Sequence, residues 1–293
     1  MVAFFYPGYE GLASADGNTD NLRGGVAVQV DDQNHSQKIL HNGREKPLRI
    51  VILAPAAADI VAKLGLGGYV AGVTSNVTNF PQASTVGTHR NPGIENIAAL
   101  EPSLIIAPSR FSEEIAARLD AVLFLYEPGS LPDILDAITQ LAALTGTTAE
   151  GEALVARLGG AIPKRAKGDR PTVVYEVRST PLSLAAQGSF LANLLDSSGF
   201  HYAYKGASGE VSPEYLLEKT PDYYIYQIGP MNRKPVPPVE RNGWSGLDTC
   251  VWKVDELAFA RPNTDSFALA NDLAAILESK TPCEAGKAFF ARP

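Results

Sequence analysis

The sequence predicts an α/β protein of two similar lobes, each built on a central, mostly parallel sheet. Three observations indicate this fold: a repeated helix, proline and strand motif, the same order of elements upstream of both copies, and the size of the chain. The chain has 293 residues, of which 45% are hydrophobic and 19% charged. This length favours about two domains, and this composition is typical of globular proteins that bury a core in each.

The motif reads GIENIAALEPSLIIA over residues 93–107 and SPEYLLEKTPDYYIY over residues 212–226. Glu95 and Glu214 open the helical part of the two copies, and a proline follows each glutamate seven positions later. Proline ends a helix because it lacks an N–H and forces the preceding residue away from the α region. The β-branched and aromatic run that follows is typical of a strand in a sheet covered on both faces.

Upstream of each copy lies a strand, and then an apolar segment that ends in glycine. The strands are LRIVILAP at residues 48–55 and TVVYEVRSTP at residues 172–181, followed by ADIVAKLGLGG and SFLANLLDSSG. Gly65 and Gly199 suit the C-terminal positions of helices, which favour a positive φ. Two half-chains with one order of elements predict two similar lobes.

The segment between the lobes is mostly helical. A capping-box-like Ser130 and Asp133 precede apolar residues at helical spacing, and a second helical pattern follows Gly146. A helical connection permits small hinge motions and resists wide closure. The resulting domains are an N-terminal extension over residues 1–47, a first lobe over 48–128, connecting helices over 129–170 and a second lobe over 171–293.

Charge and hydropathy exclude several classes of protein. The formal net charge is −7 and no basic cluster occurs, which argues against nucleic acid as a partner. No run of 18 apolar residues is present, so we expect no membrane span. The first residues lack the basic n-region of a signal peptide, but a chain whose signal had been removed would look the same. The compartment therefore stays open on this evidence.

The two cysteines, Cys250 and Cys283, have neither CxxC nor metal-ligand spacing. They form either a disulfide in an exported protein or two buried thiols, and spacing alone does not test the geometry. His, Asp and Glu show no spacing suited to a metal ion, so we expect no direct metal site.

Several segments together resemble the helical-backbone (class III) substrate-binding proteins of bacterial ABC importers, which carry ferric siderophores, haem or cobalamin. The resemblance covers most of residues 48–277 and rests on LRIVILAP, VGTHRNPGIENIAALEPSLIIAP, VSPEYLLEKTPDYYIY and WSGLDTCVWKVDELAFARPN. It implies two α/β lobes joined by one long helix, here around residues 147–167, with ligand held in a shallow cleft between the lobes. It also implies a leading hairpin within VAVQVDDQNHSQKILHNGREKPLRIV, at the end of the extension.

The resemblance also implies partners and a location. The partner would be an ABC permease with its ATPase subunits, the protein would be a monomer, and it would act in the periplasm or at the extracellular face of a membrane. Glu95 and Glu214 would dock onto permease arginines, one from each lobe. A carboxylate in the first turn of a helix is favoured by the helix dipole, and separated charges fix orientation. Two ordinary N-terminal helix glutamates are the alternative interpretation.

Loops at the carboxyl ends of the strands are expected to line the ligand site. The candidate ligand-binding residues in these loops are Pro55, Asn76, Phe80, His89, Arg90, Arg110 and Phe111 in the first lobe, and Arg178, Gln187, Arg233 and Arg261 in the second. Guanidinium groups suit carboxylates and anionic chelates. A ferric siderophore or another anionic metal complex is therefore our first expectation, with no covalent cofactor.

Other ligands and other functions stay open as alternatives. His89 could be an axial ligand if the cargo were haem, but haem members of the family show S-A-E-G where this chain has NPGIEN. Cobalamin members favour aromatic walls that include tryptophan, and Trp244 and Trp252 both lie late in the chain.

The rival classes are an enzyme on a doubly wound fold and a surface or scaffolding protein that keeps this fold without transport. No G-x-G-x-x-G follows the first strand, and no P-loop or G-x-S-x-G occurs. Only four histidines are present, which leaves few general bases. We therefore expect no enzyme.

Overall fold

The computed structural model describes residues 28–30, 37–108, 118–163, 169–207, 209–218, 220–244 and 248–279. Backbone contacts divide the chain into two compact units. Unit 1 comprises residues 1–127 and 137–154, and unit 2 comprises residues 128–136 and 155–293. Over the described ranges, every helix is too short or too polar to traverse a lipid bilayer.

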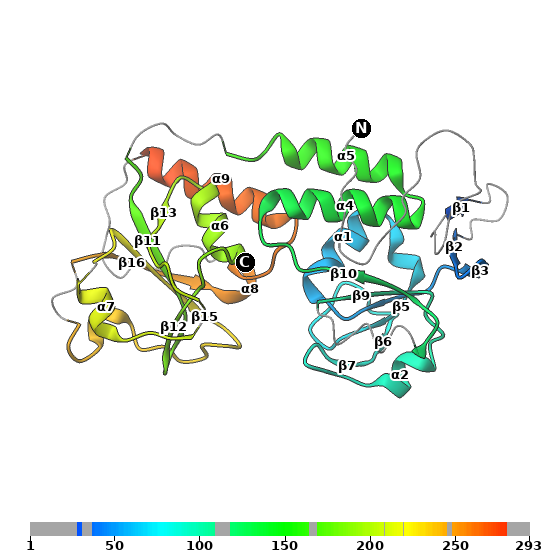
Figure 1. Cartoon of the computed structure of the whole chain (residues 1–293), viewed down its shortest axis with the longest axis horizontal. Coiled ribbons are helices and arrows are strands. Elements are labelled where there is room, and N and C mark those ends of the chain that lie inside the picture. The colour runs from blue at the N-terminus through cyan, green and yellow to red at the C-terminus, as the bar shows by residue number, and fades with distance from the viewer. Residues whose placement is uncertain are drawn as a thin grey trace. The chain divides into compact units, whose positions relative to one another are not determined.

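Unit 1 contains a five-stranded parallel sheet in the order β10-β9-β4-β5-β6 (Figure 1). Its strands are β4 (Ile50–Ile52), β5 (Val70–Val73), β6 (Ser84–Thr85), β9 (Leu104–Ala107) and β10 (Val122–Leu125). Every residue of β4 and β9 is buried, as expected for central strands covered on both faces. The short helices of the unit are η1 (Pro55–Ala57), α1 (Ala58–Lys63), η2 (Leu66–Tyr69) and α2 (Ile94–Ala98).

A three-stranded antiparallel sheet precedes the main sheet of unit 1. It consists of β1 (Val28–Val30), β2 (Gln37–His41) and β3 (Arg44–Pro47), so a hairpin lies in the segment where the resemblance implied one. The two-residue turn between β2 and β3 is Asn42–Gly43, with φ of 51° and 72°. Positive φ at both central positions is the geometry that matches the twist of a hairpin, and Asn-Gly is its preferred sequence.

Unit 2 contains a six-stranded mixed sheet in the order β14-β12-β11-β15-β16, with β13 also paired to β11. Its strands are β11 (Thr172–Ser179), β12 (Leu182–Leu184), β13 (His201–Tyr202), β14 (Gly209–Glu210), β15 (Tyr223–Ile228) and β16 (Cys250–Asp255). The β12 and β14 pairings are antiparallel, and all others are parallel. The helices are α6 (Phe190–Ser197), α7 (Pro213–Glu218), η3 (Pro238–Glu240), α8 (Glu256–Phe259) and α9 (Asp265–Ser279).

Two helices carry the chain between the units: α4 (Leu131–Thr145) and α5 (Thr148–Gly159). Ser130 Oγ accepts from the Asp133 N–H at 3.3 Å, so the predicted cap forms. Gly146, at φ 70°, separates the two helices. Helix α5 ends earlier than the expected 147–167 region, because Gly159 is its last residue and Gly160 and Pro163, which follow it, disfavour further helix.

The two units repeat one strand arrangement, as the duplicated motif predicted. In unit 1, β4 has β5 on one side and β9, then β10, on the other. In unit 2, β11, β13, β15 and β16 take the corresponding places, all parallel. The two predicted glycines also have left-handed backbones, with φ of 75° at Gly65 and 101° at Gly199.

In each unit, the residue just before β9 or β15 accepts a hydrogen bond at the start of the neighbouring strand, β4 or β11. Ser103 Oγ accepts from the Arg49 N–H at 2.9 Å, and Asp222 Oδ2 accepts from the Thr172 N–H at 2.7 Å. The Thr172 hydroxyl also donates to Asp222 Oδ2, at 2.7 Å, and this bond and the bond from the Thr172 N–H lower the pKa of Asp222. The repeat therefore extends from the order of strands to the side chains that join them.

The packing of α5 on α4 generates a stability prediction. A Cβ added at Gly151 would lie 2.4 Å from Ala142 Cβ, whereas one added at Gly159 of the same helix meets only Leu135 Cδ1 at 3.7 Å. We expect Gly151→Ala to destabilise the protein, because overpacking costs about 1–3 kcal/mol and exceeds a helix-propensity gain of about 1 kcal/mol. Gly159→Ala is the control and should be neutral or stabilising. Urea unfolding followed by far-UV circular dichroism tests this, and an equal response of the two variants would contradict it.

Candidate functional site

The candidate site in each unit is the edge of the sheet where the parallel strands end. At the unit 1 edge, backbone hydrogen bonds join neighbouring loops. The Leu53 and Ala54 N–H groups donate to Ile106 O at 2.7 and 3.1 Å, which ties the loop after β4 to β9. The Ser75 N–H donates to Gly87 O at 2.9 Å, which ties the loop after β5 to the segment beyond β6.

Three candidate residues lie in the loops of this edge. Pro55 is half-buried at the first position of η1. Asn76 is half-buried, and its Oδ1 accepts from the Ser75 hydroxyl at 3.2 Å. Phe80 is only 5% exposed, and its ring lies beside Gly67. The structure thus places Phe80 in the core, where it offers little surface to a ligand.

His89 and Arg90 form the turn of a small hairpin, between β7 (Gly87–Thr88) and β8 (Asn91–Pro92), and both are exposed. Gly87 has φ 110°, and a Cβ there would lie 2.7 Å from the backbone oxygen of Asn91. Glycine is therefore required for this hairpin. The structure brings His89 and Arg90 together at an accessible turn. Arg110 and Phe111 lie outside the described residues.

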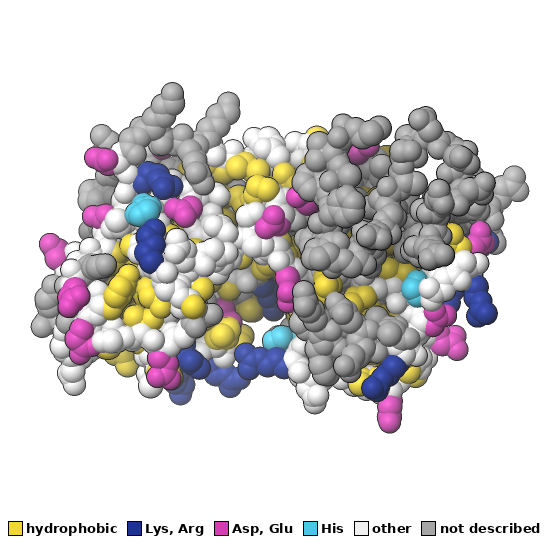
Figure 2. All heavy atoms as spheres, in the orientation of Figure 1, with side chains coloured by type: hydrophobic (Ala, Val, Ile, Leu, Met, Phe, Trp, Pro, Cys, Tyr) yellow, Lys and Arg dark blue, Asp and Glu magenta, His cyan; other side chains and the backbone are white. Residues whose placement is uncertain are grey.

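At the unit 2 edge, Arg178 and Arg233 lie on segments that are hydrogen-bonded to each other. Arg178 is near the end of β11, and Arg233 is in the β15–β16 loop, which we define as residues 229–249. The Ser179 N–H and hydroxyl donate to Asn232 Oδ1 at 3.3 and 3.0 Å. Both arginines are exposed, as is Lys234, which sequence reasoning missed. Basic side chains are visible along the lower border of unit 2 in Figure 2.

The other two candidates of unit 2 stand apart from these arginines. Gln187 is exposed in the turn before α6, and Arg261 is half-buried after α8. In the described part of the chain, no hydrogen bond joins either residue to Arg178 or Arg233. Sequence reasoning expected all four near one edge. Hydrogen bonds link the segments of Arg178 and Arg233, and the Ala185 N–H, which donates to Tyr175 O at 2.9 Å, ties the segment before Gln187 to β11.

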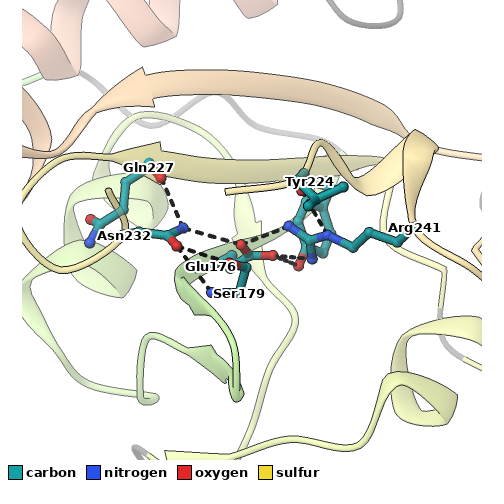
Figure 3. Close-up of polar contacts among 7 residues, drawn as sticks. Glu176, Ser179, Tyr224, Gln227, Asn232 and Arg241 are labelled. Carbon is teal, nitrogen blue, oxygen red and sulfur yellow. Dashed lines mark hydrogen bonds and ion pairs between the residues drawn. The ribbon is translucent and has the colours of Figure 1, made fainter. Parts of the chain in front are cut away.

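A fully buried carboxylate lies beneath the unit 2 edge. Glu176 of β11 is 0% exposed, and Arg241 donates to it through two nitrogens, Nη1 to Oε2 at 2.6 Å and Nη2 to Oε1 at 2.9 Å (Figure 3). The Tyr224 hydroxyl donates to Oε2 at 2.5 Å, and Asn232 Nδ2 donates to Oε1 at 3.4 Å. Such a carboxylate is stable only when it is paired and fully hydrogen-bonded.

The ionisation of this group follows from its surroundings. Burial raises the pKa of Tyr224, and the charge of Glu176 raises it further, so the phenol stays protonated and donates. Burial alone would lower the pKa of Arg241, but its hydrogen bonds to Glu176 and the charge of that carboxylate outweigh burial and raise it. The pair is therefore an ion pair inside the protein.

Sequence reasoning missed Glu176 and Arg241. The available signal was a glutamate in the middle of the apolar strand VVYEV, since a buried charge requires a partner. The partner lies 65 residues later in the sequence, in an irregular loop, so periodicity did not indicate it.

The duplicated glutamates occupy equivalent and accessible positions. Glu95 lies in the first turn of α2 and Glu214 in the first turn of α7, and both are exposed. The Ser212 hydroxyl donates to Glu214 and thereby lowers the pKa of that carboxyl. Gly93 takes the place of Ser212 in the first copy, so Glu95 lacks an equivalent donor at that position.

The sequence also raised the questions of a disulfide and of a metal site. Cys250, the first residue of β16, is disulfide-bonded, and Cys283 lies outside the described residues. Within the described ranges, no group of three or more His, Cys, Asp or Glu side chains is arranged to hold a metal ion.

Residues 50–238 match the family model described as periplasmic binding protein. This match spans more than half of the chain, and the chain belongs to that family. The match and the two sheets confirm the predicted fold class. The family consists of substrate-binding proteins for transport, so the chain is a binding protein and not an enzyme.

Named relatives support the same class. A cobalamin-binding protein of Halobacterium salinarum is 26% identical over 201 residues, which are 61% of this chain and 54% of the relative. The chain therefore spans about half the length of that relative. The uncharacterized ABC transporter substrate-binding lipoprotein YvrC of Bacillus subtilis is 24% identical over 244 residues, 75% of this chain and 74% of YvrC.

A solved structure shows the fold. S. aureus IsdE in complex with heme matches with a TM-score of 0.65 and 18% identity, covering 78% of this chain and 98% of IsdE.

The buried ion pair generates a stability prediction for unit 2. Arg241→Ala should lower the free energy of unfolding by about 3–5 kcal/mol, because Glu176 is left buried without its cation. Arg233→Ala is the control, since an exposed side chain without a buried partner should change stability by less than about 0.5 kcal/mol. Urea unfolding followed by tryptophan fluorescence tests this, because Trp244 and Trp252 both lie in unit 2. A loss below about 1 kcal/mol in Arg241→Ala would show that the pair contributes little.

Proposed function

We propose that this chain is the extracytoplasmic substrate-binding protein of an ABC importer and that it captures an anionic metal complex, with a ferric siderophore as first choice. One observation carries the choice of ligand. Arg178, Arg233 and Lys234 are exposed at the unit 2 edge, and none makes an ion pair within the described part of the chain. The whole chain has a net charge of −7, so a local group of unpaired cations favours an anionic ligand.

Family membership and the named relatives support the transport role. In that role the partner is an ABC permease with its ATPase subunits, the binding protein acts as a monomer, and it works in the periplasm or at the outer face of a membrane. Glu95 and Glu214 would contact the permease, one from each unit. Their exposure in equivalent first turns supports this proposal, since each carboxylate is available to a cationic partner.

Cobalamin is the second candidate ligand, because the relative from Halobacterium salinarum is named for binding it. Haem is the third, since His89 is exposed at a turn of the unit 1 edge and IsdE is complexed with heme. A scaffold that keeps the fold without transport is the remaining alternative, and binding measurements separate it from the others.

The ligand choice predicts the effect of removing a cation. Arg178→Ala and Arg233→Ala should each weaken binding of an anionic ferric complex by about 1.5–3 kcal/mol for each charge-assisted hydrogen bond that is lost. Arg110→Ala, at an arginine candidate of the first lobe, should weaken binding in the same way. Arg157→Ala, an exposed cation on α5, is the control and should leave the affinity unchanged.

Titrations followed by tryptophan fluorescence would compare ferric citrate, catecholate and hydroxamate complexes, haemin and cobalamin. Tight haemin binding, with a Soret shift that His89→Ala abolishes, would overturn the order of preference. Failure of the wild-type protein to bind any of these complexes would favour the scaffold alternative.

The docking proposal predicts that substitution of Glu95 and Glu214 impairs delivery to the permease without changing the affinity for the ligand. Glu95→Lys and Glu214→Lys should leave ligand binding intact and cost only about 0.3–1 kcal/mol of stability each, through the lost interaction with the helix dipole. Uptake, or ATPase activity stimulated in the cognate transporter, should fall strongly, most of all in the double variant, because like charges would face each other. Glu152→Lys, on the exposed face of α5, is the charge-matched control. Wild-type uptake in the double variant would refute the docking assignment.

A further inference from the structure

The β15–β16 loop combines an exposed face with buried anchors. Met231 and Val236 are 47% and 50% exposed, and Arg233 and Lys234 between them are also exposed. The loop therefore presents two apolar and two cationic side chains to solvent, at the edge where the parallel strands of unit 2 end.

Backbone pairing alone does not hold this loop in place. Its residues 235, 237 and 238 are prolines, which have no N–H to donate. The first turn is closed by paired hydrogen bonds between Gly229 and Asn232, at 3.2 and 3.1 Å. Beyond that turn, the Glu240 and Arg241 N–H groups donate within the loop, to Pro237 O at 2.9 Å and Pro238 O at 3.1 Å. Side chains join the loop to the elements beneath it.

Three side chains act as anchors: Glu256 and Asn232 are buried, and Arg241 is half-buried. Glu256 Oε2 accepts from the Met231 N–H at 2.7 Å. Asn232 is 5% exposed, and its Nδ2 donates to Gln227 O at 3.0 Å and to Glu176 at 3.4 Å. Arg241 Nε donates to Val236 O at 2.8 Å. The exposed residues thus lie between anchored positions.

Glu176 connects two of these anchors, as Figure 3 shows. It accepts from both Arg241 and Asn232, so one buried carboxylate contacts the loop on both sides of the exposed Arg233, Lys234 and Val236. Arg241 also lies over the Trp244 ring, with 4.7 Å from Cζ to the ring centroid. Without the carboxylate, Arg241 would lose its buried counterion, and turning toward water would then lower its free energy.

We propose that Glu176 is a positioning residue for ligand capture: through Arg241 and Asn232 it holds the β15–β16 loop in its binding conformation before the ligand arrives. A loop that is already ordered avoids the entropy loss of ordering on binding. The role of Glu176 in ligand capture rests on the proposed function, whereas its role in ordering the loop does not.

The first test needs no ligand. Hydrogen exchange of the full chain should show that Glu176→Gln speeds exchange of the Met231 and Asn232 amides by on the order of ten- to a hundredfold, as expected for the loss of a hydrogen-bonded charge. Leu194→Ala is the control, because Leu194 is fully buried in α6 and lies in the same unit. Similar loop exchange in both variants would reveal a merely structural role and overturn the proposal.

A second variant protects the test against misfolding. Arg241→Lys keeps the charge but removes the two-nitrogen contact and the bond to Val236 O. It should speed hydrogen exchange of the Met231 and Asn232 amides, but by less than Glu176→Gln does. If the loop amides of Arg241→Lys exchange at the wild-type rate, the proposal fails.

The second test uses whichever complex of the titration panel the wild-type protein binds. Glu176→Gln should lower its association rate constant about tenfold, whereas Leu194→Ala should retain the wild-type rate. Faster loop exchange with unchanged association would overturn the role in capture. If the wild-type protein binds no complex, the proposed function fails, and the exchange experiment still decides whether Glu176 positions the loop.

Discussion

Both sheets depend on the pairing of two parallel strands, β4 with β9 and β11 with β15. In each unit the first strand of the pair lies in the middle of the sheet order, and the second strand pairs directly with it. The proline before that strand is buried in both units, and the short helix that it ends carries an exposed glutamate in its first turn. The same order of helix, proline and strand thus places an exposed carboxylate a few residues before a buried strand in both units.

Local chemistry explains what could be predicted from the sequence. The helix, proline and strand motif, the left-handed glycines and the cap at Ser130 depend on residues close together in the chain, and the structure contains all of them. The burial of Phe80 could not be predicted from the sequence, because an aromatic residue in a loop suits either a core or a ligand surface. The ion pair between Glu176 and Arg241 could not be predicted either, since it joins distant residues through a loop without periodicity.

The two sheet edges are stabilised in different ways. At the unit 1 edge, N–H groups of Leu53, Ala54 and Ser75 donate to backbone carbonyls, so the loop positions follow from the strands themselves. At the unit 2 edge, a buried carboxylate and its side-chain partners hold the loop. A substitution at Glu176 or Arg241 would remove side-chain contacts of the second edge, whereas these backbone bonds of the first edge involve no side chain.

The chain passes from one unit to the other three times, before α4, inside α4 and inside α5, so neither unit is a continuous stretch of sequence. Unit 1 ends at residue 127 and resumes at residue 137, and its last part precedes residue 155. A gene fragment cut at any single point would remove helix from one unit or leave a foreign half-helix on the other. Lobes of this kind cannot be exchanged between genes by simple recombination at a linker, and the pair is expected to be inherited as one segment.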